Sequence, residues 1–91
     1  GTLSIALQPA ADEQFTIGPR TYTFKALADS DGQITIGADA LATQVNIVAA
    51  INGTDGTNTA NPVATAADFA ANDSVITARE TGIQGNTIAT T

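Results

Sequence analysis

The sequence predicts an α+β fold, in which a mainly antiparallel sheet of about five to six short strands carries one amphipathic helix on a face. Three observations predict it. Apolar and polar residues alternate in several segments of residues 2–36. Apolar residues recur with a helical period over residues 39–52, and short apolar runs follow after residue 62. We take residues 1–91 as one small module, because this length suits a single domain.

Alternating patterns place the first strands. We expect strands at residues 2–7, 15–17, 22–24 and 33–36. The second and third form a hairpin, because Gly18-Pro19-Arg20-Thr21 between them has proline at the second turn position. Residues 29–32, Asp-Ser-Asp-Gly, predict a turn in which Gly32 takes a positive φ. Phe15, Tyr22 and Phe24 make this end the densest part of the predicted core.

A helix is predicted over residues 39–52. Leu41, Val45, Val48 and Asn52 recur at spacings of four, three and four, and Ile47 and Ile51 fill the adjoining positions, which together make one face of a helix. Asp39 suits the N-cap and Gly53 the position after the last turn. We expect the Leu41/Val45/Val48 stripe to lie on the sheet of its own chain, although such a stripe can also dock a partner.

The second half of the chain predicts a polar loop and three short strands. Residues 53–62 contain no apolar side chain larger than alanine, so we expect an exposed loop. Strands are expected at residues 63–66, 75–79 and 87–90, with turns at Asn72-Asp73 and at the glycine pair Gly82-x-x-Gly85. That pair lacks the lysine and hydroxyl residue of a phosphate-binding loop.

Composition narrows the function. Three basic residues stand against nine acidic ones, for a net charge of −6, which argues against nucleic-acid binding. No apolar run is long enough to cross a bilayer, so we expect no membrane insertion. The chain has no histidine and no cysteine, and it therefore lacks the commonest general base, the commonest metal ligand and any thiolate.

The remaining side chains give no pattern typical of catalysis. A Ser-Lys dyad would have to use Lys25, which a solvated strand lysine explains more simply. A carboxylate pair for glycoside cleavage could come from Asp68, Asp73 and Glu80, but all three lie beside predicted turns, where acids serve the backbone. We therefore expect a protein that is not an enzyme, with no catalytic, cofactor-binding or metal-binding residues.

A calcium site is the one metal alternative that stays open. Asp29-x-Asp31-Gly32 is superficially like an EF-hand loop, but aligning Gly32 with the sixth loop position puts Leu27 first and Ala38 last, and neither can bind calcium through its side chain. An irregular site could still use Asp29 with Asp31, or Asp55 with Asn58.

The order of these elements resembles a known module. The runs that carry the resemblance are Phe15-Thr16-Ile17-Gly18, Thr21-Tyr22-Thr23-Phe24, Ile34-x-Ile36-Gly37-Ala38, Asn46-Ile47-Val48-Ala49-Ala50-Ile51-Asn52, and Val75-Ile76-Thr77-Ala78-Arg79-Glu80-Thr81-Gly82-x-x-Gly85-Asn86-Thr87-Ile88-Ala89-Thr90. Together they are similar to a module of bacteriophage virion proteins, found in tail, fibre and capsid-associated chains. Pro19 departs from the usual glycine or polar residue, which is a benign change in a turn.

The resemblance implies a structural role in the virion, an extracellular particle. It implies a capsid decoration, a tail component or a fibre component that contacts other virion proteins or copies of itself, and it carries no catalytic residues. The first and last predicted strands would be the places for pairing with a neighbour. The alternative is an adhesin module that binds a carbohydrate or another host-surface ligand through the Asp55-Gly56-Thr57-Asn58 loop, with or without calcium.

Overall fold

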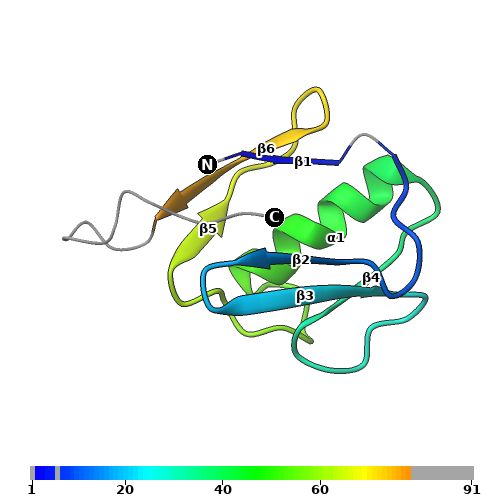
Figure 1. The fold of residues 1–91 in the computed structure, drawn as a ribbon, viewed down its shortest axis with the longest axis horizontal. Coiled ribbons are helices and arrows are strands. Elements are labelled where there is room, and N and C mark those ends of the chain that lie inside the picture. The colour runs from blue at the N-terminus through cyan, green and yellow to red at the C-terminus, as the bar shows by residue number, and fades with distance from the viewer. Residues whose placement is uncertain (1, 6, 79–91) are drawn as a thin grey trace.

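Two small sheets and one helix make up the described part of the fold. The computed structural model describes residues 2–5 and 7–78. Its elements are β1 (Thr2–Ser4), β2 (Gln14–Ile17), β3 (Arg20–Lys25), β4 (Gln33–Thr35), α1 (Ala40–Asn52), β5 (Ala64–Ala66) and β6 (Asp73–Ala78). The strand orders are β1-β6-β5 and β2-β3-β4 (Figure 1). The predicted α+β class is confirmed, but the strands divide between two sheets where one was expected.

The predicted hairpin forms the start of the second sheet. β2 and β3 are antiparallel, with Phe15 opposite Tyr22, and the turn is tighter than expected because β3 already begins at Arg20. Gly18 has a φ of +59°, and a Cβ added there would overlap with Cγ2 of Val63. Both the backbone conformation and the close approach therefore require glycine at this position.

β4 departs from the expected antiparallel pattern. It runs parallel to β3, with Phe24 opposite Ile34. The turn before it matches the prediction, because Gly32 has a φ of +91°. The carbonyl oxygen of Gly32 accepts a bond from the N–H of Thr23, so the chain has already turned back along β3 when β4 begins.

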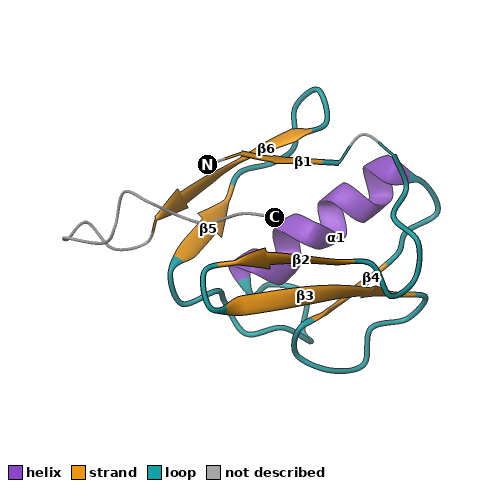
Figure 2. Ribbon diagram, in the orientation of Figure 1, coloured by secondary structure: helices purple, strands orange, loops and turns teal. Residues whose placement is uncertain are grey.

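The helix begins and ends where the sequence predicts. The Asp39 side chain accepts a hydrogen bond from the N–H of Ala42 at 2.9 Å, which satisfies a donor of the first turn. Gly53 ends the helix in the left-handed region, with a φ of +75°. α1 packs against β4 of one sheet and β5 of the other, and Figure 2 shows it beside both sheets.

The predicted face of the helix is right for Ile47 and Ile51, which are buried, and for Val48, which packs against the core, but it is wrong for two residues. Leu41 and Val45 are 68% and 69% exposed. The buried positions are Thr43, Gln44, Ile47, Ala50 and Ile51. The inward face can hold two polar residues because their polar atoms are bonded: the amide of Gln44 donates to the carbonyl oxygen of Ile5 at 2.8 Å, and the hydroxyl of Thr43 donates to Gln8 at 2.7 Å.

The first sheet joins the two ends of the described chain. β1 and β5 lie on either side of β6, and both are antiparallel to it. β1 is shorter than the predicted strand 2–7, and Leu7 is exposed beyond it. The predicted strand 87–90, the turn at Gly82 and Gly85, and Glu80 lie outside the described residues.

One apolar core connects the two sheets and the helix. Its buried members are Leu3, Phe15, Ile17, Tyr22, Phe24, Ile34, Ile47, Ala50, Ile51, Ala64, Ala66 and Ile76. The three aromatic side chains predicted for the core are buried there, and the rings of Phe15 and Tyr22 stack with centroids 5.1 Å apart.

The loop 53–62 is less exposed than predicted. Asn58 and Asn61 are buried within it. The amide of Asn61 donates to the carbonyl oxygen of Ile17 and to the hydroxyl of Tyr22, at 3.2 and 3.1 Å. The loop is thereby fastened to the β2–β3 hairpin, which composition alone could not indicate.

Candidate docking surface

The outward face of α1 forms an apolar groove. Leu41 and Val45 are exposed, while Val48 and Phe69 are partly buried against the core. The groove has a volume of about 560 Å³ and is lined by Leu41, Gln44, Val45, Val48, Ala49, Thr54, Asp68 and Phe69. We call this surface the α1 groove. Large apolar side chains gathered on one exposed face are typical of a surface that contacts another molecule.

The α1 groove comes from two segments of the chain. The helix supplies one wall, and the connection between β5 and β6 supplies Asp68 and Phe69. That connection is held in place at its far end, because Asn72 accepts a bond from the amide of Gln44 at 3.1 Å. The Gln44 side chain therefore links the helix, which forms one wall of the groove, to the β5–β6 connection, which forms the other.

Among the described residues, Asp68 is the one charged side chain that lines the α1 groove. Residues 39–78 contain Asp39, Asp55, Asp68 and Asp73 but no lysine or arginine. The two basic residues of the described chain lie on β3 and are ion-paired, Arg20 with Asp31 and Lys25 with Asp12. Neither pair includes a residue that lines the groove.

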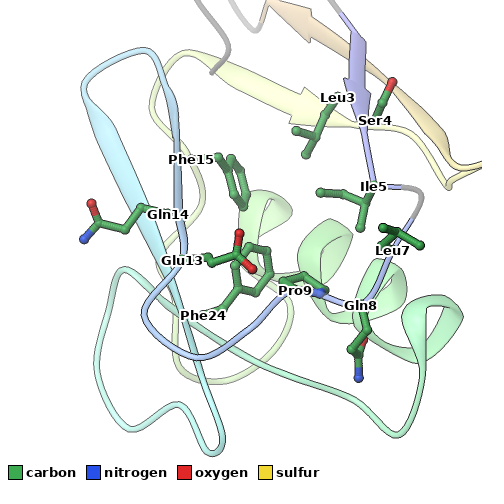
Figure 3. Close-up of a pocket in the computed structure, with 10 residues that line it drawn as sticks. All are labelled: Leu3, Ser4, Ile5, Leu7, Gln8, Pro9, Glu13, Gln14, Phe15 and Phe24. Carbon is green, nitrogen blue, oxygen red and sulfur yellow. The ribbon is translucent and has the colours of Figure 1, made fainter.

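A second groove lies between the two sheets. It has a volume of about 470 Å³, with β1 and the segment after it on one side and β2 with Phe24 of β3 on the other (Figure 3). Its apolar walls Leu3, Phe15 and Phe24 are only 5%, 4% and 3% exposed. These three side chains belong to the core, whereas Leu7, which also lines this groove, is 82% exposed, so its exposed apolar surface comes mainly from the segment after β1.

The structure brings together the two polar loops that the sequence singled out. The Asn58 side chain accepts a bond from the N–H of Gly32 at 2.7 Å and donates to the carbonyl oxygen of Gln33. Asp31 accepts bonds from the N–H and hydroxyl of Thr59 and from Arg20. Asp31 and Asn58 belong to the two separate calcium alternatives that the sequence suggests, Asp29 with Asp31 and Asp55 with Asn58.

Hydrogen bonds inside the protein already use these carboxylates. The hydrogen bond from Arg20, followed by that from the Thr59 hydroxyl, holds the pKa of Asp31 well below its usual range. Burial alone would raise the pKa of Asp55, but bonds from the backbone and side chain of Asn58 and from the N–H of Thr57 outweigh it and lower that pKa. The Asp31 carboxylate in turn raises the pKa of Arg20 through their hydrogen bond.

Of the other acids considered for chemistry, Asp68 and Asp73 lie within the described residues. Asp68 lies in the α1 groove, and Asp73 accepts a bond from the hydroxyl of Ser4 at 2.5 Å. Within residues 2–5 and 7–78, no group of three or more His, Cys, Asp or Glu side chains could hold a metal ion. In the same part of the chain, no helix is long and apolar enough to cross a membrane.

Comparison with protein-family models, with curated proteins and with solved structures found no match to this chain. The case for a function therefore rests on the described surfaces and on the sequence resemblance.

Proposed function

We propose that this chain is a non-catalytic structural module of a bacteriophage particle, a capsid decoration or a tail or fibre component. It acts through contacts with other virion proteins or copies of itself in a multi-copy assembly. The observation that carries the contact role is the exposed apolar face of α1, where Leu41 and Val45 leave about two-thirds of their surface to solvent. The virion setting is supported by the resemblance of the ordered sequence runs to phage modules.

A contact role suits the chemistry of the α1 groove. The groove contains one ionisable side chain, Asp68, and otherwise apolar, amide and hydroxyl groups. Such a lining gives binding energy through burial of apolar surface and offers no pair of groups for proton transfer or nucleophilic attack. Many copies on one particle would multiply a weak contact into a stable one.

The adhesin alternative has weaker support. The Asp55 carboxylate already accepts bonds from the N–H groups of Thr57 and Asn58, at 2.9 and 2.7 Å. The Asn58 side chain is buried and bonded to the backbone of β4 and the turn before it. A surface ligand at this loop would have to displace bonds that hold the fold together.

The test compares two leucines that are both exposed. Leu41→Asp puts a charge into the α1 groove, and Leu27→Asp puts the same charge on a leucine that is 76% exposed and does not line the groove. Particles produced with each variant are imaged by electron microscopy, and the copies of the protein per particle are counted. We expect Leu41→Asp to be lost from the particles and Leu27→Asp to be retained.

Light scattering and circular dichroism on the isolated variants check that both stay folded. The proposal is overturned if both variants assemble at wild-type copy number, or if the wild-type protein is found in no particle.

A further inference from the structure

We propose that the α1 groove binds a short amphipathic segment of a different protein, with apolar residues facing the groove and lysine or arginine beside them. This inference rests on the proposed contact role and adds the chemistry of the partner. Its basis is the combination of an exposed apolar wall, an exposed carboxylate of Asp68 in the lining, and a net charge of −6 for the chain.

The shape of the groove favours a narrow occupant. One wall is a straight helix face, with Leu41, Val45 and Val48 one turn apart. The opposite wall is Phe69, and Asp68 beside it is exposed at the rim. An apolar stripe of another segment fits between these walls, as amphipathic helices fit grooves in other recognition systems.

The negative charge of the chain favours a different protein over a second copy as the occupant of the groove. Two copies docked through this face would bring the Asp68 carboxylate of each into one interface. Of the basic residues that the structure describes, Arg20 and Lys25 are both paired within the chain. A copy therefore has little positive charge to offer, and its own net charge of −6 adds repulsion.

A cationic partner removes this repulsion. A lysine or arginine next to the apolar stripe would lie near the Asp68 carboxylate and gain a favourable charge contact. Such pairs at the rim of an interface mainly determine which partner is chosen and how fast it associates. The groove thereby selects for positive charge without having to bury it.

The binding test uses a defined probe. A fluorescein-labelled helical peptide of leucine and lysine, with the leucines on one face, is titrated with the intact protein, and fluorescence anisotropy gives the Kd. Two control peptides are measured alongside: one with every lysine replaced by glutamate, and one with the same composition in an order that has no apolar face. We expect the first peptide to bind at least about tenfold more tightly than either control, since like charge or a lost apolar face removes one of the two contributions.

Matched variants locate the binding site. Leu41→Asp should raise the Kd about tenfold or more through a charge buried in the groove, while Leu27→Asp, with the same added charge, should leave it within about twofold. Asp68→Asn should weaken binding about two- to fivefold. Asp29→Asn removes the same charge from a residue that does not line the groove and should have a smaller effect.

Three results would overturn the inference. These are equal binding of the glutamate peptide, equal loss with Leu27→Asp and Leu41→Asp, and self-association of the wild-type protein that Leu41→Asp abolishes while the cationic peptide does not bind. The last result would place a second copy in the groove and leave the proposed contact role intact. Failure of that role itself is seen separately, as normal assembly of Leu41→Asp into particles.

Discussion

Amide side chains hold this small fold together at places where backbone ladders are short. Asn52 donates to the carbonyl oxygen of Ala66 and accepts from its N–H, both at 2.9 Å, so one side chain reproduces a pair of strand bonds. Asn46 donates to the carbonyl oxygen of Thr35 on β4. Asn61 has no exposed surface and joins its loop to the Tyr22 hydroxyl. Each of these bonds satisfies a buried or half-buried backbone or side-chain group that would otherwise be costly to desolvate.

The Asp31 carboxylate should make stability depend on pH. Its pKa is lowered in the folded protein by Arg20, so the stabilisation is fully present above the usual aspartate pKa of about 4 and is lost as pH falls through the lower folded value. In urea titrations, Asp31→Asn should unfold earlier than wild type at pH 7, and the gap should narrow as the pH is lowered below about 4.

The matched control for this measurement is Asp29→Asn, because Asp29 bonds to Ser30 and takes part in no ion pair that the structure describes. It should follow wild type across the same range. A gap between Asp31→Asn and wild type that stays constant down to pH 2 would contradict the assigned role of the ion pair.

The helix is the element where the two faces can be told apart by experiment. Ile47 is fully buried, so Ile47→Ala should lower the free energy of unfolding by about 2–5 kcal/mol through lost burial and the cavity left behind. Leu41→Ala removes the same number of carbon atoms from an exposed site and should change the free energy of unfolding by no more than about 0.5 kcal/mol. Chemical denaturation of the two variants measures both values. Equal losses would mean that Leu41 is covered by the protein itself.

The same element shows what the sequence could and could not predict. The caps were predictable, because Asp39 and Gly53 act through local backbone geometry. The buried face was not, because apolar residues cover more than half of the helix and two overlapping stripes compete. Periodicity selects Leu41/Val45/Val48, but the inward stripe includes Thr43 and Gln44, whose burial depends on partners at Gln8, Ile5 and Asn72 far away in the sequence. The presence of Gln44 and Thr43 beside Ile47 was the available signal.

The sequence identified the helix residues that form the docking surface, but it did not predict that they would be exposed. Leu41, Val45 and Val48 were identified as one stripe and assigned to the core. Phe69 gave no sign of joining them, because the path from β5 to β6 is a tertiary feature. The polar loops were identified as candidate ligand sites, and the ion pair from Arg20 that occupies Asp31 could not be found from spacing.

At the scale of the whole molecule, the two sheets share one core and should unfold together. Asn52 joins α1 to β5 of the first sheet, whereas Tyr22 lies in the second sheet. Asn52→Ala should lower the free energy of unfolding by about 2 kcal/mol, because two backbone groups of Ala66 lose their partner.

Tyr22 fluorescence and far-ultraviolet circular dichroism report this loss from different places. Their transitions should shift by the same amount in Asn52→Ala, as expected for a two-state domain. Asn46→Ala removes the hydrogen bond between α1 and β4 and serves as the matched comparison in the second sheet. A shift seen by dichroism but not by Tyr22 would mean that the sheets unfold separately.

The uneven distribution of basic residues also determines which reagents can react with the segment that forms the docking surface. Between Lys25 and Arg79 the chain offers no site for trypsin, so the whole stretch from Ala26 to Arg79, with α1 and its groove, is released as a single long peptide. Amine-reactive cross-linkers likewise find no lysine there. A carbodiimide, which joins a carboxylate directly to an amine, would instead couple Asp68 to a lysine of a bound partner and so record the contact as a covalent bond.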